Sequence, residues 1–182
     1  MSDPTTQSNY HQIQTKHVFF DWALDFTKQS IVGSATHDLL VLEDGVSEVI
    51  FDTSDLELHR IEVKERKSKY VGSTMSASDF SDKRVQYELK AKHEVMGFAL
   101  HIPLPSSLKK DSTVKVTVHY QTTKSCTALQ WLDKQQTQGK SFPYLFSQCQ
   151  PIHARALAPI QDTPSVKITY SAKVTSILPA VM

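Results

Sequence analysis

The sequence lacks an excess of charge of either sign. Twenty lysines and arginines balance nineteen aspartates and glutamates, so the formal net charge at pH 7 is +1. Proteins that hold nucleic acid or an anionic membrane by long-range attraction need a surplus of positive charge. The two short basic runs, Lys64–Lys67 and Lys109-Lys110, are typical of solvated turns and strand ends. We therefore expect neither nucleic acid nor a membrane among the partners.

Long apolar runs, cysteine and asparagine are also scarce. A membrane helix needs roughly 20 mainly apolar residues, and the polar residues 1–10 do not resemble a signal peptide. Cys126 and Cys149 are too few for a disulfide framework. The single asparagine, Asn9, lies outside the Asn-x-Ser/Thr glycosylation pattern. These absences lead us to expect a reducing, cytoplasmic location.

Familiar catalytic patterns are missing as well. The helical zinc motif His-Glu-x-x-His begins at His93-Glu94, but position 97 is glycine, and the surrounding sequence indicates a strand or turn. The other histidines show no ligand spacing, and neither Gly-x-Ser-x-Gly nor a phosphate-binding glycine loop occurs. Cys149 and His153 could form a nucleophile pair, although a structural thiol is the favoured interpretation. We expect no catalytic residue, no metal ligand and no cofactor in this chain.

The sequence is rich in alternation with a period of two. Apolar and polar residues alternate along 18–26, 114–120 and 166–174. Because side chains two apart share one face of a strand, each stretch is predicted to bury one face and expose the other. About eight strands with short polar breaks favour an all-β fold, either an antiparallel twisted sheet or a β-sandwich. The weaker strand candidates are Ile31–Leu42, Glu48–Asp52, Leu56–Lys64, Arg84–Ala91 and Gly97–Ile102.

The breaks between these strands carry turn and loop signals. Asp44-Gly45 predicts a turn, Ser76–Lys83 a polar loop, and Pro103–Ser107 a connection, since proline donates no hydrogen bond to a ladder. The only helix signal is a short capped turn over Asp133–Gln136. The proline-rich stretch Trp131–Pro164 is predicted to be a long ordered excursion between the last two clear strands. Excursions of that length are commonly functional.

Five segments carry a family resemblance in their order and spacing. They are Ala128–Leu132, Gly139-Lys140, Pro143–Gln150, Ile152–Arg155 and Gln161–Tyr170. Together they resemble the leukotriene A4 hydrolase branch of the M1 zinc aminopeptidases. Weaker likenesses upstream extend the resemblance over nearly the whole chain. The resemblance implies the saddle-like N-terminal β-domain of this family, with residues 1–182 as one domain.

The same resemblance implies which parts of such an enzyme lie elsewhere. The family continues into a thermolysin-like catalytic domain and a helical domain. The catalytic domain carries Gly-x-Met-Glu-Asn and His-Glu-x-x-His, and neither motif occurs in residues 1–182. The ending Ile177–Met182 resembles family sequence that continues, so we expect a domain truncated near its C-terminal edge. Zinc is expected in the full-length protein and not in this chain.

Candidate site residues follow from the resemblance. In the family a glutamine-rich loop of the N-terminal domain reaches the active-site cleft, and the matching residues are Gln148, Cys149, Gln150 and Pro151. In the intact enzyme they are expected to meet a peptide N-terminus or a small lipid epoxide. An amide oxygen such as that of Gln150 can accept from an ammonium group without adding a charge. Pro151 replaces a small residue of the relatives and removes a backbone donor.

Three hypotheses of function follow. In the first, the chain is the N-terminal domain of a zinc metallopeptidase of this family, an aminopeptidase with or without epoxide hydrolysis, and supplies one wall of the substrate cleft. In the second, it is a stand-alone non-catalytic β-sandwich binding module. In the third, Cys149 and His153 make it an independent hydrolase. Arg155 and Asp162 fall on recurrent family positions and are interpreted as ions that brace the loop.

Overall fold

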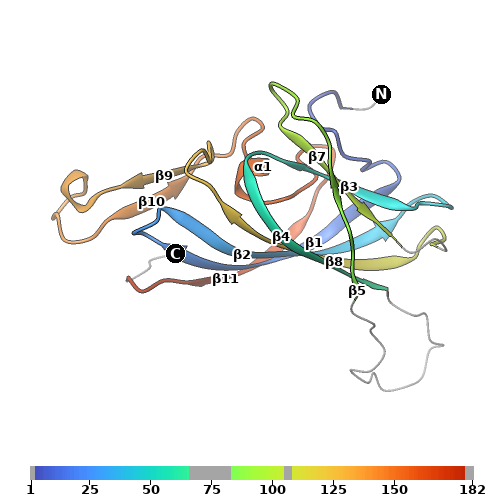
Figure 1. Cartoon of the computed structure of the whole chain (residues 1–182), viewed down its shortest axis with the longest axis horizontal. Helices are drawn as coiled ribbons and strands as arrows, with labels where there is room; N and C mark the ends of the chain where they lie inside the picture. The colour runs from blue at the N-terminus through green and yellow to red at the C-terminus, as the bar shows by residue number, and fades with distance from the viewer. Residues whose placement is uncertain (1–2, 66–82, 105–107, 179–182) are drawn as a thin grey trace, which may run out of the picture.

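The computed structural model describes residues 3–65, 83–104 and 108–178, which form an almost entirely β structure (Figure 1). Eleven strands, one four-residue α-helix and one three-residue 3₁₀ turn make up the regular structure of this described part. The all-β fold class that the alternating sequence predicts is confirmed.

Six strands form the main sheet, in the order β11-β1-β2-β8-β4-β5. Strand β8 shows why these residues form strands, since Val114, Val116, Val118 and Tyr120 are buried while the residues between them are half-exposed. Successive side chains leave a strand on opposite faces, so one face of the sheet can be apolar and the other wet. The strands are β1 Ile13–Asp25, β2 Ser30–Val41, β4 Leu56–Glu65, β5 Lys83–Arg84, β8 Thr113–Thr122 and β11 Thr169–Thr175.

The main sheet is mixed, which modifies the expectation of a purely antiparallel one. Strand β11 runs parallel to β1, with His17 opposite Thr169 and Ala23 opposite Thr175. The other described pairings in this sheet are antiparallel. A parallel neighbour requires a long connection, and here most of the chain lies between the two strands.

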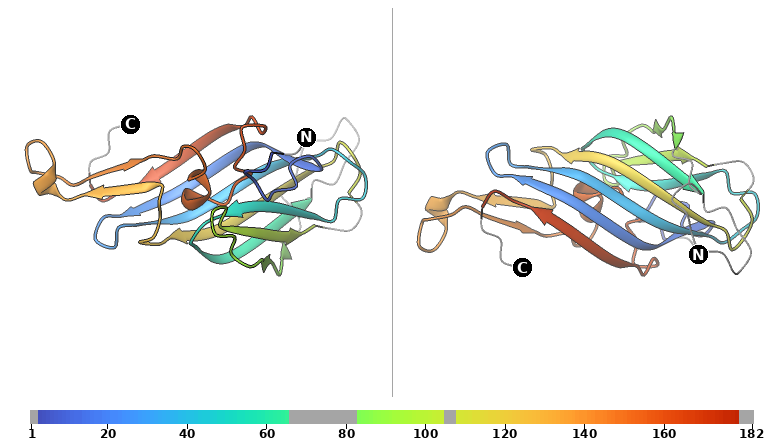
Figure 2. Two further views of the ribbon diagram at one scale, coloured as in Figure 1. Left: turned by 90° about the horizontal axis from the view of Figure 1, so that it is seen from above. Right: turned by 90° about the horizontal axis from the view of Figure 1, so that it is seen from below.

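A smaller sheet of three strands, in the order β3-β7-β6, covers one face of the main sheet (Figure 2). The largest apolar cluster lies between the layers, since it joins Leu39 and Val116 of the main sheet to Phe51 and Leu100 of the smaller one. This arrangement confirms the predicted β-sandwich. The strands are β3 Glu48–Thr53, β6 Glu88–Leu89 and β7 Phe98–Pro103.

A second, smaller core lies beside the short helix α1, Ala154–Leu157. Val18 and Tyr120 of the main sheet pack there against Ala158, which follows the helix. The indole Nε1–H of Trp22 donates to the Tyr120 hydroxyl at 2.8 Å, so the buried hydroxyl keeps a partner. The sequence analysis did not predict α1, because a single helical turn leaves no periodic pattern.

Strands β9, Leu129–Leu132, and β10, Tyr144–Ser147, pair as a hairpin that extends away from the sandwich (Figure 1). The predicted excursion Trp131–Pro164 therefore contains β10 and the end of β9. The predicted turn at Asp133–Gln136 is confirmed. A 3₁₀ turn spans Lys134–Gln136, and the side-chain oxygen of Gln136 accepts from the Asp133 backbone N–H at 2.9 Å.

Two predicted strands have different bounds in the structure. The stretch Arg84–Ala91 is interrupted, and its two parts, β5 and β6, belong to different sheets. Strand β11 begins only at Thr169, because the Val166 N–H donates to the Thr163 carbonyl at 3.1 Å in a turn. Local turns thus shorten strands that alternation alone would extend.

The predicted turn at Asp44-Gly45 is confirmed, with Gly45 at a φ of 80°. Most of the predicted loop Ser76–Lys83, and Pro105–Ser107 of the predicted connection, lie outside the described residues. In the described part of the chain, no helix is long and apolar enough to cross a membrane.

Candidate functional site

The segment Gln148–Pro151 leaves the hairpin at the end of β10 and leads into α1. Its first residue continues the hairpin ladder, because the Gln148 N–H donates to the Ala128 carbonyl at 2.9 Å. The Cys149 carbonyl then accepts from the His153 N–H at 2.7 Å, which forms the turn before the helix. The bond between Gln150 and Pro151 is cis. The backbone of the four site residues predicted from the resemblance is therefore held by hydrogen bonds at Gln148 and Cys149.

The two glutamine side chains of this segment face solvent. Gln148 and Gln150 are both exposed, and no other described residue makes a hydrogen bond to either side-chain amide. An amide offers an acceptor oxygen and two donor hydrogens. Both side chains are therefore able to bind a ligand without first breaking a contact inside the described chain.

Cys149 lacks the environment of a nucleophile. Burial, followed by the negative charge of Asp162, raises the pKa of the Cys149 thiol, whereas a nucleophilic cysteine needs a lowered pKa. The His153 ring is engaged elsewhere, since its Nδ1 lies 2.8 Å from the Thr127 hydroxyl. The geometry thus gives no support to the hypothesis of a Cys149–His153 hydrolase.

His93 lies in a tight turn and not on a metal-binding helix. The His93 N–H donates to the Gly97 carbonyl at 2.7 Å, and the Gly97 N–H donates back at 3.1 Å. The ring Nδ1 of His93 accepts from the N–H groups of Val95 and Met96, each at 3.2 Å. Across the described residues, no three His, Cys, Asp or Glu side chains come together as a metal site. The donor set of a catalytic zinc does not fit any part of that structure.

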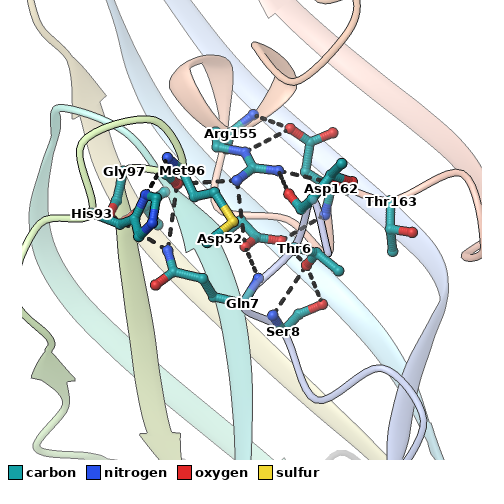
Figure 3. A network of polar contacts seen from close by, with 12 residues as sticks. Thr6, Gln7, Ser8, Asp52, His93, Met96, Gly97, Arg155, Asp162 and Thr163 are labelled. Carbon is teal, nitrogen blue, oxygen red and sulfur yellow. Dashed lines mark hydrogen bonds and ion pairs between the residues drawn. The ribbon is translucent and has the colours of Figure 1, made fainter. Parts of the chain in front are cut away.

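Arg155, in the first turn of α1, follows the segment and is buried in a network of polar contacts (Figure 3). Only 2% of the residue is exposed. Its Nε–H donates to the Asp162 carboxylate at 2.9 Å, and its Nη1 and Nη2 donate to the carbonyls of Met96 at 3.0 Å and Thr5 at 2.7 Å. A further bond joins Nη2 to the Asp162 carbonyl at 3.1 Å. Because the guanidinium is already occupied by protein groups, Arg155 is not available to a substrate.

Asp52 of β3 is fully buried in the same cluster. One carboxylate oxygen lies 3.7 Å from Arg155 Nη1 and accepts from the Gln7 N–H at 2.7 Å. The other accepts from the Asp162 N–H at 3.0 Å and from the Thr6 hydroxyl. Burial raises the pKa of Asp52, while these hydrogen bonds and the arginine charge oppose that rise. The predicted bracing role of Arg155 and Asp162 is confirmed by these contacts.

The sequence analysis missed two parts of this arrangement. The first is the set of contacts that Asp52 and the residues Thr5–Gln7 make with a segment about 100 to 150 positions later, because such pairings leave no local pattern. The second is an apolar groove of about 470 Å³ between the hairpin and the end of the main sheet. Ser147 borders it, so the groove adjoins the glutamine segment. Its lining includes Trp22, Phe26, Ile31, Leu129, Leu145, Leu157 and Val174.

Comparison with known proteins now decides the family. The family model described as the peptidase M1 N-terminal domain matches residues 7–182. The chain belongs to this family. Leucine aminopeptidase 2 of Sclerotinia sclerotiorum is 39% identical to it over 178 residues, and the match covers 97% of this chain and 27% of that protein. A leukotriene A-4 hydrolase homolog of Botryotinia fuckeliana is also 39% identical, over 97% of this chain and 25% of that protein.

Solved structures agree with this assignment. Yeast LTA4 hydrolase in complex with bestatin superposes with a TM-score of 0.80 and 34% identity, over 98% of this chain and 25% of that one. An M1 zinc metallopeptidase from Deinococcus radiodurans shares the fold, with a TM-score of 0.62 at 14% identity. The M1 N-terminal domain thus spans about a quarter of the length of the relatives it matches.

Proposed function

We propose that this domain forms one wall of the substrate cleft of a longer M1-type aminopeptidase, with Gln148–Pro151 next to the N-terminal end of a bound peptide. The observation that supports this best is the pair of exposed glutamines without side-chain partners among the described residues, on a backbone held by hydrogen bonds at Gln148 and Cys149. The relatives named leucine aminopeptidase 2 point to the same class of substrate.

Gln150 is the residue proposed to read the substrate amine. Its amide oxygen can accept a hydrogen bond from a peptide ammonium, and a neutral acceptor loses less on desolvation than a carboxylate does. Pro151 has no N–H, so the segment can donate a backbone hydrogen bond at 150 or 152 but not between them. The side-chain amide of Gln150 is thus the main polar group that this part of the segment presents to a substrate.

We propose that the catalytic residues and the metal site lie outside these 182 residues. The described residues form no three-ligand metal cluster, and the raised pKa keeps the Cys149 thiol protonated. A zinc ion in the remaining part of the longer protein would supply the activated water. A cytoplasmic location belongs to the same proposal, because both cysteines are free thiols.

The test is Gln150→Leu in the longer protein that carries this domain. Leucine keeps the approximate volume of the side chain and removes the amide. Loss of a hydrogen bond to a charged group costs about 1.5–3 kcal/mol, which corresponds to a roughly 10- to 150-fold lower kcat/KM for peptides. Gln148→Leu, two residues away and equally exposed, is the matched comparison.

The loss should be specific to substrates with an ammonium group. A small lipid epoxide, the substrate class suggested by the leukotriene A-4 hydrolase homolog, carries no amine and should lose less activity than a peptide. Equal losses on both substrates would show that Gln150 organises the segment and does not read the amine. Unchanged peptide hydrolysis would reject the proposed contact.

A further inference from the structure

We infer that the N-terminal arm, residues Asp3–Asn9, is a positioning element for the glutamine segment. This inference rests on the proposed function, because it assigns to the arm the task of holding Gln150 in place. The arm reaches the segment through one buried group, the Arg155 cluster of Arg155, Asp52 and Asp162 (Figure 3). The contacts of the arm with this cluster could not be read from the sequence.

The arm completes the hydrogen bonding of the cluster. The Thr5 carbonyl accepts the shortest hydrogen bond that the Arg155 guanidinium makes, at 2.7 Å. The Gln7 N–H and the Thr6 hydroxyl donate to the two carboxylate oxygens of Asp52. Without the arm, a buried arginine would lose an acceptor and a buried carboxylate would lose two donors, and both losses are costly away from water.

The cluster in turn fixes the chain that follows the glutamine segment. The Ser54 N–H donates to the Arg155 carbonyl at 2.9 Å, so α1 is tied to the end of β3. The backbones of Asp52 and Ile160 exchange hydrogen bonds at 2.8 and 3.2 Å, which ties the chain after the helix to the same strand. Only three residues separate Pro151 from Arg155. A shift of Arg155 would therefore move the C-terminal anchor of the glutamine segment.

The arm is held at its far end as well. The Thr163 hydroxyl donates to the Asp3 carboxylate, and the Asp3 N–H donates to the Tyr10 hydroxyl at 3.0 Å. The side chain of Asn9 donates to the Glu48 carbonyl at 3.0 Å and accepts from the Ile50 N–H at 2.9 Å. These contacts place Thr5–Gln7 over the cluster as a strap.

Thr6→Val is the sharpest variant, because valine keeps the shape of threonine and removes the hydroxyl that donates to Asp52. Thr5→Val is the matched control in the same arm. Among the described residues the Thr5 hydroxyl bonds only to the half-buried Asp3 carboxylate, and the carbonyl that Arg155 uses remains. A variant lacking residues 2–7 removes the whole strap. Substitution of Arg155 itself is avoided, since loss of a buried cation can unfold the domain.

The first readout is hydrogen exchange of the His153 backbone amide, whose N–H donates to the Cys149 carbonyl at 2.7 Å. We expect faster exchange in Thr6→Val, still faster exchange in the deletion, and wild-type rates in Thr5→Val. The β9–β10 hairpin amides should be unchanged in all three and serve as the internal reference. Unchanged exchange of the His153 amide in the deletion variant would overturn the inference, whatever the activity measurements give.

The second readout is peptide kcat/KM of the longer protein, at a temperature where circular dichroism shows each variant folded. Thr6→Val should lower it roughly three- to tenfold, since small misplacement of a positioning group is enough to slow a reaction. Added to Gln150→Leu, it should cause no further loss, whereas a general loss of structure would add to that of Gln150→Leu. Additive losses, or no loss from Thr6→Val, would overturn the arm's positioning role. If Gln150→Leu alone has no effect, the proposed function fails, and exchange alone decides the role of the arm.

Discussion

His37 of β2 shows how one buried side chain makes stability depend on pH. The residue is fully buried and stacks against Phe51 with ring centroids 4.3 Å apart. Nε2 lies 3.1 Å from the Pro159 carbonyl, an acceptor only, so Nε2 carries the hydrogen of the neutral ring. Nδ1 then accepts from the Thr15 hydroxyl at 3.3 Å. Burial lowers the pKa of His37 to about 4, although the Pro159 hydrogen bond and the Asp38 charge oppose this.

The folded chain should therefore lose stability as the pH falls from 6.5 toward 4. The folded pKa is about 4 and the unfolded one 6.5, so the unfolded state takes up the proton first. The contribution is complete above pH 6.5 and disappears as the pH falls through the folded pKa. Linkage gives a loss of about 2 kcal/mol by pH 5. Urea unfolding at pH 7 and pH 5 measures it.

His37→Gln is the control, because glutamine can keep a donor toward Pro159 and an acceptor toward Thr15 without titrating in this range. All other histidines are shared with the wild type, so the difference between the two pH dependences isolates His37. Equal losses of unfolding free energy in both proteins would mean that His37 is protonated as easily in the folded state as in the unfolded one.

Single residues also show which contacts can be predicted from the sequence and which cannot. The resemblance placed Arg155 and Asp162 seven positions apart in one loop, and the structure brings them into contact at 2.9 Å. The same reasoning could not find Asp52 or Thr6, because their partners lie about 110 and 46 positions away along the chain. A buried polar cluster forms where the fold brings distant segments together. Alternation patterns indicate only which face of a strand is apolar.

At the scale of elements, period-two alternation predicted the long strands well and the short ones poorly. Strands β1, β2 and β8 have ten or more residues, enough for a clear pattern. Strands β9 and β10 have four each, and α1 is one turn. Their stability comes from pairing and from buried neighbours and not from their own sequence. The order of the sheets and the parallel pairing of β11 depend on contacts between distant segments.

The turn between His93 and Gly97 should tolerate no side chain at its last position. Gly97 has a φ of 72°, and an added Cβ would lie 2.3 Å from the Thr53 carbonyl oxygen. The left-handed conformation costs a non-glycine residue roughly 1–2 kcal/mol, and the clash should add about 1–3 kcal/mol. We expect Gly97→Ala to lower the free energy of unfolding by about 2–4 kcal/mol in chemical denaturation.

Gly45→Ala separates the cost of the left-handed backbone conformation from the cost of the steric clash. Gly45 has a φ of 80°, and nothing lies within 4 Å of an added Cβ. It should therefore show only the conformational cost of roughly 1–2 kcal/mol. If the two variants lose the same stability, the close approach of the 93–97 turn to β3 is not a constraint. This turn also presents the Met96 carbonyl to Arg155, so glycine at position 97 has a structural reason.

At the scale of the whole molecule, the parts that fold the domain and the parts proposed to meet a substrate are separate. The main core lies between the two sheets, whereas the glutamine segment lies between the hairpin and α1 (Figure 1). The N-terminal arm and Arg155 connect the two regions. Substitutions in the sandwich core should therefore act mainly on stability, and those in the glutamine segment mainly on binding.

The same separation predicts that the 182-residue chain binds no stoichiometric zinc. A zinc site needs at least three protein ligands held together. In the described residues no such group of His, Cys, Asp or Glu exists. Several ring nitrogens are also committed, as in the 2.9 Å contact of His101 Nδ1 with Glu48 and the 2.8 Å contact of His17 Nδ1 with Thr169. Metal binding at these nitrogens would have to break the contacts.

Metal analysis tests this directly. The chain is stripped with chelator, reloaded with zinc, desalted and measured by mass spectrometry of the metal, and we expect well under one zinc per chain. The longer protein, treated in the same way, is the positive control and should hold about one zinc with its open coordination position. It should also hydrolyse peptides, whereas the short chain should not. One tightly held zinc on the short chain would mean that its histidines rearrange into a site, and the assignment of all chemistry to the remaining part of the protein would then be wrong.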